Sequence, residues 1–307
     1  MRLIVNADDF GLTPGVDRGI AAAVAAGTVT SVSVMANLAE PAAVARLAAL
    51  RPGVSLGAHL NLTTGRPLTP AGDLPSLVDG EGNFHSLAVL TRRSLVRRTR
   101  RAEVARELGA QIARLRDIGV AIDHLDSHEH VHLLPGVLGE VIRLARRFGV
   151  PRMRTHRPRL LGRGDTLAYY RRHPRRLASH AAKRLIALRL RLAGIATPDG
   201  MVAGSLLREP VAGGPRAEWQ AIAGSLPPGI WELVVHPADL DVARDATASA
   251  RLGDLVERRG AELAALLDPR FREMLATRGV ALVPFAAVPA AAEPAPLAEE
   301  RYATRGA

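Results

Sequence analysis

The 307-residue sequence contains no cysteine, and a single lysine, Lys183, stands among its 41 basic residues. The absence of cysteine excludes disulfides, thiolate metal ligands and a cysteine nucleophile. Aromatic residues make up only 3% of the chain, which leaves few rings on which nucleic-acid bases could stack. No uncharged apolar run approaches the length of a membrane-spanning helix, and no signal-peptide pattern precedes the first apolar run. We therefore expect a cytoplasmic protein.

The net charge of +11 is concentrated in one segment. Residues 152–191 contain 13 basic residues and one acidic residue, Asp165, whereas the rest of the chain has 28 basic and 29 acidic residues. The preference for arginine over lysine and the abundance of alanine are typical of a GC-rich genome. Part of the arginine excess therefore reflects codon usage and not recognition of phosphate groups.

Short β-branched runs alternate along the chain with longer segments of helical periodicity. The predicted strands are residues 3–6, 30–35, 54–62, 122–127, 153–155, 231–235 and 280–285, and the predicted helices are residues 14–26, 41–50, 102–118, 135–148, 178–195 and 252–267. This alternation predicts a single-domain parallel α/β fold shaped as a (β/α) barrel, either incomplete or seven-stranded. We place the barrel at residues 1–285, with a basic helical insert at about 156–200 and an Ala/Pro-rich tail, expected to be disordered, at 286–307.

Aspartates and histidines collect where the predicted strands end. Asp8 and Asp9 follow the first strand in NADDFG, His59 lies in GAHLNLT, and His236 ends the strand in WELVVHP. The motif HLDSHEHVHLLP contains His124, Asp126, His128, His130 and His132. In a barrel, the loops at the carboxyl ends of the strands surround one common site, so we expect these side chains to meet.

Asp8 and Asp9 are adjacent, so an irregular backbone is needed for both side chains to face one site. Adjacent residues of a regular strand face opposite sides of a sheet, so Asp8 and Asp9 can share a site only where the strand ends and Gly11 permits unusual dihedral angles. Two bare carboxylates repel each other, and a divalent cation would relieve that repulsion. One carboxylate and two imidazoles form a common metal-ligand set with a position left open for water. Separately, Asp8 and Asp9 could cap a helix and His59 could be a core histidine, but together they favour a metal site.

These motifs, in this order over roughly 230 residues, resemble the YdjC/ChbG-like carbohydrate deacetylase family, including its branch associated with hopanoid biosynthesis. The resemblance implies a metal-dependent, barrel-like enzyme that removes the N-acetyl group from an amino sugar in an oligosaccharide or glycolipid. By motif, Asp9, His59 and His128 correspond to the metal ligands and Asp8 to the catalytic base. By its position, His236 is our candidate for the acid that protonates the leaving amine.

Other polar residues of the same motifs are candidates for contacting the sugar. They are Asn61, His124, Asp126, His130 and His132. His124 is also an alternative to His128 as the second imidazole ligand, because it lies in the same motif. We expect one divalent metal ion, Zn²⁺ or Mg²⁺, and nitrogen-rich ligation favours zinc in vitro. The cation would lower the pKa of the water that attacks the acetyl carbonyl.

Two other functions compete with deacetylation. A metal-dependent phosphoesterase uses the same residue types, but it usually relies on two metal ions and on more carboxylates than Asp8, Asp9 and Asp126 supply. A basic nucleic-acid-binding protein would use residues 152–191 and would lose affinity as salt is added. That function leaves the histidines unexplained, so we expect no nucleic-acid partner.

The basic segment has two interpretations of its own. Its helix at 178–195 has an apolar stripe made of Ala178, Ala181, Ala182, Leu185, Leu188, Leu192 and Ile195. The stripe either packs on the barrel wall, as in an ordinary amphipathic helix, or belongs to a basic surface that holds the enzyme at the anionic inner membrane near a glycolipid. Monomer and homo-oligomer are both compatible with the sequence.

Overall fold

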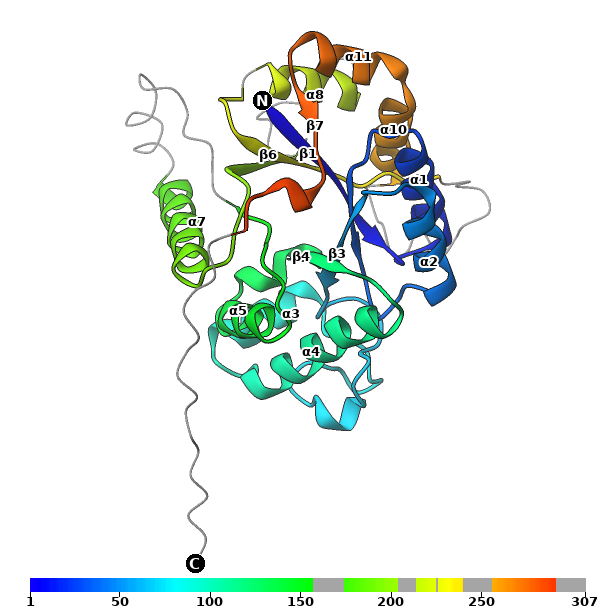
Figure 1. Ribbon diagram of the computed structural model, residues 1–307. Coiled ribbons are helices and arrows are strands. Elements are labelled where there is room, and N and C mark those ends of the chain that lie inside the picture. Colours follow the sequence, from blue (N-terminus) through cyan, green and yellow to red (C-terminus); the bar gives the residue numbers. More distant parts are fainter. Residues whose placement is uncertain (157–173, 204–213, 225, 240–255, 291–307) are drawn as a thin grey trace, which may run out of the picture.

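Seven parallel strands form the centre of the computed structural model, which describes residues 1–156, 174–203, 214–224, 226–239 and 256–290 (Figure 1). Their order in the sheet is β4-β3-β2-β1-β6-β5, with β7 beside the first residues of β1. The strands are β1 (Arg2–Phe10), β2 (Ser31–Val34), β3 (Ser55–Leu60), β4 (Ile122–Ser127), β5 (Gly200–Ala203), β6 (Ile230–Val235) and β7 (Ala281–Leu282).

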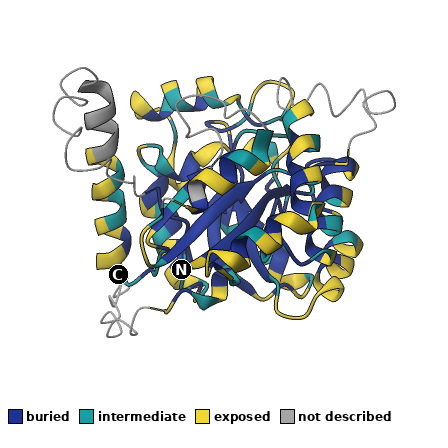
Figure 2. Cartoon of the chain, turned by 90° about the horizontal axis from the view of Figure 1, so that it is seen from above, coloured by how far each residue is buried: buried dark blue, intermediate teal, exposed yellow. Residues whose placement is uncertain are grey.

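Helices join the strands and surround the buried sheet, which forms the dark centre of the view in Figure 2. The α-helices are α1 (Pro14–Ala25), α2 (Pro41–Leu50), α3 (Leu87–Leu95), α4 (Arg101–Asp117), α5 (Val137–Arg147), α7 (Pro174–Leu192), α8 (Gly214–Ala223), α10 (Val256–Leu267) and α11 (Pro269–Thr277). Short 3-10 turns are η1 (Ala71–Asp73), η2 (His128–Leu133) and η5 (Phe285–Ala287). α1 begins at Pro14 after the N-cap Thr13, whose Oγ1 accepts a hydrogen bond from the backbone N of Val16 at 3.3 Å.

The sheet is curled, and short bridges link its two edges. Leu125 of β4 bridges to Met153, and the neighbouring Arg152 bridges to Ala196, just before β5. The segment predicted as a strand at 153–155 therefore joins the sheet only through isolated bridges and does not form a strand. The predicted parallel α/β fold, a single domain with a barrel-like sheet, is confirmed.

Phe285 fills the end of the barrel at which the strands begin. It is fully buried, its backbone N donates a hydrogen bond to Oγ of Ser31 at 2.8 Å, and it clusters with Ile4, Ile230 and Val288. Because Val288 is also buried, the folded chain continues past the predicted boundary at residue 285. Most of the predicted tail, residues 291–307, lies outside the described residues.

The structure contains elements that the sequence analysis missed. α3, β5, α8 and α11 had no predicted counterpart, and β7 is shorter than expected because the chain turns into η5. β5 has only four residues, too few for a clear alternation of apolar and polar positions. α3 buries only Leu90 and Ser94 while Leu95 is 66% exposed, so its apolar residues do not form one periodic face. Of the predicted basic insert, residues 157–173 lie outside the described residues.

Candidate active site

The end of β1 is irregular at Asp9. This residue has a φ of +72°, and the pairing of β1 with β2 shifts register between Ala7 and Phe10. The sequence predicts this freedom at Gly11, which does have a φ of +102°, but the backbone already departs from the regular strand at Asp9. A left-handed aspartate is uncommon and mildly strained, and such strain is often retained at functional sites. Asp8 and Asp9 are both buried, and each has a carboxylate oxygen within 4.8 Å of a ring nitrogen of His59.

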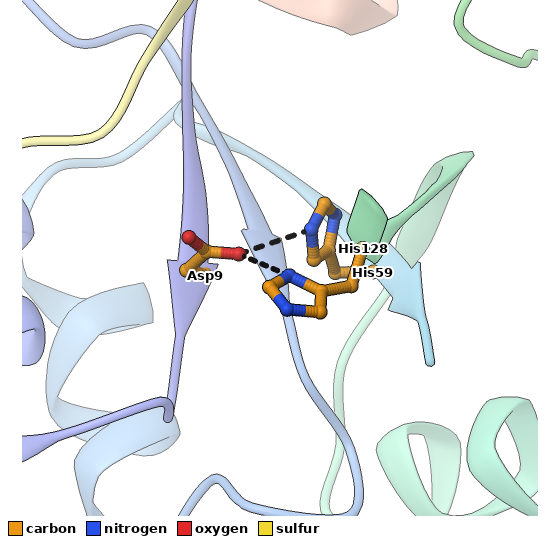
Figure 3. Close-up of side chains that lie close together, drawn as sticks. All are labelled: Asp9, His59 and His128. Atoms are coloured by element: carbon orange, nitrogen blue, oxygen red, sulfur yellow. Dashed lines mark hydrogen bonds and ion pairs between the residues drawn. The ribbon is translucent and has the colours of Figure 1, made fainter. Parts of the chain in front are cut away.

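Side chains from three strand ends converge on one carboxylate oxygen (Figure 3). Oδ1 of Asp9 lies 3.2 Å from Nε2 of His59, in β3, and 2.8 Å from Nδ1 of His128, just after β4. The three ligating atoms all lie within 4.8 Å of one another. The residues predicted as a ligand set from three separate motifs are therefore neighbours in the fold.

Asp126 orients His59. Its Oδ1 lies 2.8 Å from Nδ1 of His59, which directs the other ring nitrogen towards Asp9. A carboxylate behind a ligating imidazole is a recurrent feature of metal sites, because it fixes the tautomer and the ring orientation. Burial disfavours the charged ring, but the neighbouring Asp126 and Asp8 outweigh burial and raise the pKa of His59 to about 10. The prediction that Asp126 contacts the sugar does not fit its complete burial.

Asp8 is held by an arginine that the sequence analysis did not single out. Arg154 is fully buried, and its NH1 and NH2 donate to Oδ2 and Oδ1 of Asp8, both at 2.6 Å. The same guanidinium lies 2.8 Å from Oδ2 of Asp126 and donates from Nε to Oε1 of Glu232 at 2.7 Å. Burial alone would raise the pKa of Asp8, but the charge and hydrogen bonds of Arg154 together with the nearby His59 outweigh burial and lower that pKa. The one feature of the sequence that could have indicated Arg154 is that this charged residue lies in a predicted strand, at 153–155.

Asp9 has an arginine of its own. NH2 of Arg259, from α10, donates to Oδ2 of Asp9 at 2.6 Å, while Oδ1 faces the two imidazoles. Burial would raise the pKa of Asp9, but His128 and Arg259 outweigh it and hold the pKa well below its usual range. Arg259 lies in the first turn of α10, and nothing in the local sequence marks it as part of the site.

His236, at the end of β6, lies beside Asp8. Its Nε2 is 3.9 Å from Oδ2 of Asp8, and its side chain is 38% exposed. The backbone N of His236 donates to Oε2 of Glu262 at 2.6 Å, which ties the strand end to α10. Of the two residues predicted to move protons, Asp8 is buried and fixed, whereas His236 is reachable from solvent.

His124 does not join the site. Its ring is fully buried and stacks on Phe285, with ring centroids 4.0 Å apart and planes within 2°. Its Nδ1 lies 2.5 Å from Oδ1 of Asp123 and its Nε2 lies 3.4 Å from Oγ of Ser33. The alternative of His124 as the second imidazole beside Asp9 is wrong for this structure, and its burial also does not fit sugar contact. Its side chain points into the barrel below the site, whereas His128 lies beyond the strand end.

Asn61 is a structural residue of the loop after β3. Its side-chain oxygen accepts hydrogen bonds from the backbone N of Thr63 and of Thr64, both at 3.0 Å, and its Nδ2 donates to Oδ1 of Asn37 at 3.1 Å. Gln111 of α4 accepts from its backbone N at 2.9 Å and donates to its backbone O at 2.7 Å. Asn61 is fully buried, so the prediction that it contacts the sugar does not fit the structure.

The last two predicted sugar contacts differ in exposure. His130 is exposed and His132 is buried, with Nδ1 of His132 2.5 Å from Oγ of Ser127. Their rings lie near that of His156, at centroid distances of 4.4 Å for His130 and 5.0 Å for His132. His130 is therefore the member of this group that a ligand can reach from solvent.

The buried Glu232 predicts how stability depends on pH. Burial is the main cause that raises its pKa to about 7, from 4.5. Because the folded state then holds a proton that the unfolded state releases, the contribution of Glu232 to the free energy of unfolding should fall as pH rises from about 4.5 to about 7, by about 3 kcal/mol. Glu232→Gln lacks this contribution, so urea denaturation should show the variant gaining stability relative to wild type between pH 5 and pH 8. A difference that does not change with pH would contradict a raised pKa.

The fold and these contacts define an α/β protein with an Asp/His site at the carboxyl ends of a curled parallel sheet. The chain belongs to the YdjC-like protein family, whose family model matches residues 2–277. The resemblance noted in the sequence is therefore confirmed.

The proteins similar to this chain include several carbohydrate deacetylases. A carbohydrate deacetylase from Geobacillus stearothermophilus is 34% identical over 285 residues, which cover 92% of this chain and 96% of the relative. Carbohydrate deacetylases from Brevibacillus brevis and Homo sapiens are each 40% identical, over 49% of this chain and 58% and 47% of their own lengths. A protein from Enterococcus faecalis V583, crystallised as a candidate cellobiose-phosphate cleavage protein, aligns with a TM-score of 0.69 and 26% identity over 92% of this chain and 97% of its own.

Proposed function

We propose that this chain is a metal-dependent carbohydrate deacetylase that removes the N-acetyl group from an N-acetylated amino sugar. The observation that carries the proposal is the convergence of Asp9, His59 and His128, whose ligating atoms all lie within 4.8 Å of one another. The full-length similarity to a protein named carbohydrate deacetylase supports the reaction. The sugar is carried by an oligosaccharide or a glycolipid.

The side chains around Asp9 fit one divalent cation. Two groups of three ligating side chains occur in the described part of the chain, and both use His59. The second group adds Asp8 and Asp126, but both carboxylates are bonded to Arg154, whose positive charge opposes a cation there. The first group offers one carboxylate and two imidazoles, a set that suits Zn²⁺ better than Mg²⁺. A divalent cation bound there would lower the pKa of a water and stabilise negative charge on the acetyl oxygen.

Asp8 and His236 are suited to the two proton transfers that amide hydrolysis requires. We assign Asp8 as the base, because its lowered pKa keeps it ionised and Arg154 fixes its position beside the cluster. A low pKa also makes it a weak base, so its contribution depends on accurate placement. We assign His236 as the acid, because its ring lies beside Asp8 and is reachable from solvent. Arg154 positions Asp8 and does not itself contact the substrate.

The contacts of Arg154 favour deacetylation over the phosphoesterase alternative. A two-metal phosphoesterase needs carboxylates that can bridge or hold a second cation. Asp8 and Asp126 are the nearest candidates, and Arg154 binds both. The two possible ligand groups also share His59, so they describe one site and not a pair.

Acetate release from a substrate panel tests the proposed function. The panel contains N-acetylglucosamine oligosaccharides, a lipid-linked N-acetylglucosamine, an O-acetylated sugar and a sugar phosphate. We expect acetate only from N-acetylated substrates, loss of activity after treatment with a chelator, and recovery with one equivalent of Zn²⁺ per chain. Release of phosphate, or full activity in the metal-free protein, would overturn the proposal.

A further inference from the structure

α7 packs on the protein with a different face from the one predicted. Leu190 is fully buried, and Ile186 and Ala193 pack against the core beside it. Within α7 the predicted stripe is instead exposed from Ala181 to Leu192, with Leu185 at 59% and Leu192 at 75% exposure, whereas Ile195, beyond the end of the helix, is buried. The interpretation that this stripe packs on the barrel wall is therefore wrong. The helix has two apolar faces, and periodicity alone does not tell which one the core covers.

The outward face of α7 has a definite composition. At 100° per residue, four apolar residues form its centre and three arginines lie along its two sides. We call this face the α7 surface; it consists of Ala181, Leu185, Leu188, Leu192, Arg184, Arg189 and Arg191. Arg184 and Arg191 lie on one side of the leucines and Arg189 on the other. The sequence of α7 contains no acidic residue.

The position of α7 leaves this face uncovered by the described part of the chain. The helix stands at the periphery of the molecule in both views (Figure 1, Figure 2). Three of the eight large hydrophobic residues exposed among the described residues lie on this one helix face, Leu185, Leu188 and Leu192. Single exposed leucines are ordinary on protein surfaces, but a contiguous group marks a site of interaction.

We propose that the α7 surface docks the protein onto an anionic lipid membrane. The leucines enter the boundary between headgroups and acyl chains, while the flanking arginines extend their guanidinium groups to the phosphates. Charge selects this occupant over a second copy of the chain. Symmetrical pairing of two α7 surfaces would bring arginines of both copies together, with no acidic side chain on either helix to compensate them.

No helix among the described residues is long and apolar enough to cross a bilayer. The contact that we propose lies in the plane of the membrane surface. It does not rest on the proposed deacetylase activity, because binding to lipid can be measured without a substrate.

Co-sedimentation with vesicles tests the proposal on the full chain. The vesicles contain either phosphatidylcholine alone or phosphatidylcholine mixed with phosphatidylglycerol, at low and at high salt. We expect binding to the anionic vesicles only, weakened by salt. Leu185→Ser with Leu188→Ser should weaken binding about tenfold or more, and Arg184→Ser with Arg191→Ser should also weaken it and reduce its salt dependence.

A matched pair of changes on another helix provides the control. In α3, Leu95 and Arg92 are exposed, and Leu95→Ser with Arg92→Ser should leave vesicle binding unchanged. Thermal melting of every variant separates lost binding from lost folding. Absence of binding by the wild-type chain, or equal loss in the α3 variant, would overturn the proposal. A dimer in solution that the leucine changes dissociate, without vesicle binding, would show instead that a second copy occupies the α7 surface.

Discussion

Replacing Asp8 by Asn should leave the metal content unchanged and lower the rate of acetate release by about 10²–10⁴-fold, the usual effect of losing a general base. Asp8 is not among the three side chains that converge at the Asp9 oxygen, so its charge is not needed to hold the cation. The amide has the same shape but cannot accept the proton. Arg154 keeps the Asp126 carboxylate and the carboxyl group of Glu232 as partners, so the change should not leave its charge unpaired.

The measurement combines metal analysis with turnover. Asp123→Asn is the matched control, because it makes the same change in β4 at a residue that contacts His124 away from the site. His236→Ala, compared on substrates with poor and good leaving groups, separates the acid from the base. It should be most harmful on the poorest leaving group, whereas Asp8→Asn should slow all substrates alike. Near-normal turnover in Asp8→Asn would remove the residue from the mechanism.

His59→Ala should lose both the metal and the activity. Removing a residue behind a ligand typically costs 10–100-fold in metal affinity, so removing the ligand itself should cost more than about 100-fold. The same holds for His128→Ala and Asp9→Ala. Asp126→Asn disturbs only the hydrogen-bond partner of His59, so it should lower metal affinity by about 10–100-fold.

Titration with Zn²⁺ and metal analysis after dialysis test this order of effects. His130→Ala is the control, since His130 lies close to His128 in sequence but is exposed and not among the converging side chains. It should keep full metal content. His59→Gln repeats the test with a side chain that fills the space of the imidazole better than alanine does. Full occupancy in both His59 variants would show that the cation is held elsewhere.

The repulsion between the adjacent Asp8 and Asp9 is relieved in the fold by a means that the sequence did not suggest. Repulsion between bare carboxylates was the argument for a cation, yet each aspartate has its own arginine in the fold. Arg154 holds both oxygens of Asp8, whereas Arg259 holds one oxygen of Asp9 and leaves the other facing the histidines. We infer that this difference assigns the roles, with Asp9 available as a ligand and Asp8 as a base.

Local rules account for what the sequence determined by itself. The alternation of strands and helices, the start of α1 at Pro14 and the position of most strands follow from periodicity and capping, which depend on neighbours along the chain. That the aspartate and histidine motifs meet was expected because parallel strands bring their carboxyl ends to the same edge, whereas the choice of Asp9, His59 and His128 among them came from the resemblance to the YdjC/ChbG-like family. These features need no knowledge of which strand lies beside which.

The tertiary structure decided everything that depends on contacts between distant segments. Burial against Phe285 separates His124 from His128, although both lie in one motif. Arg154 and Arg259 reach Asp8 and Asp9 across 146 and 250 residues of sequence, so no local pattern could reveal those pairs. α7 likewise carries two apolar faces, and the core covers only the one around Leu190. In each case the sequence supplies the chemical groups, and the packing of the helices and strands determines which of them meet.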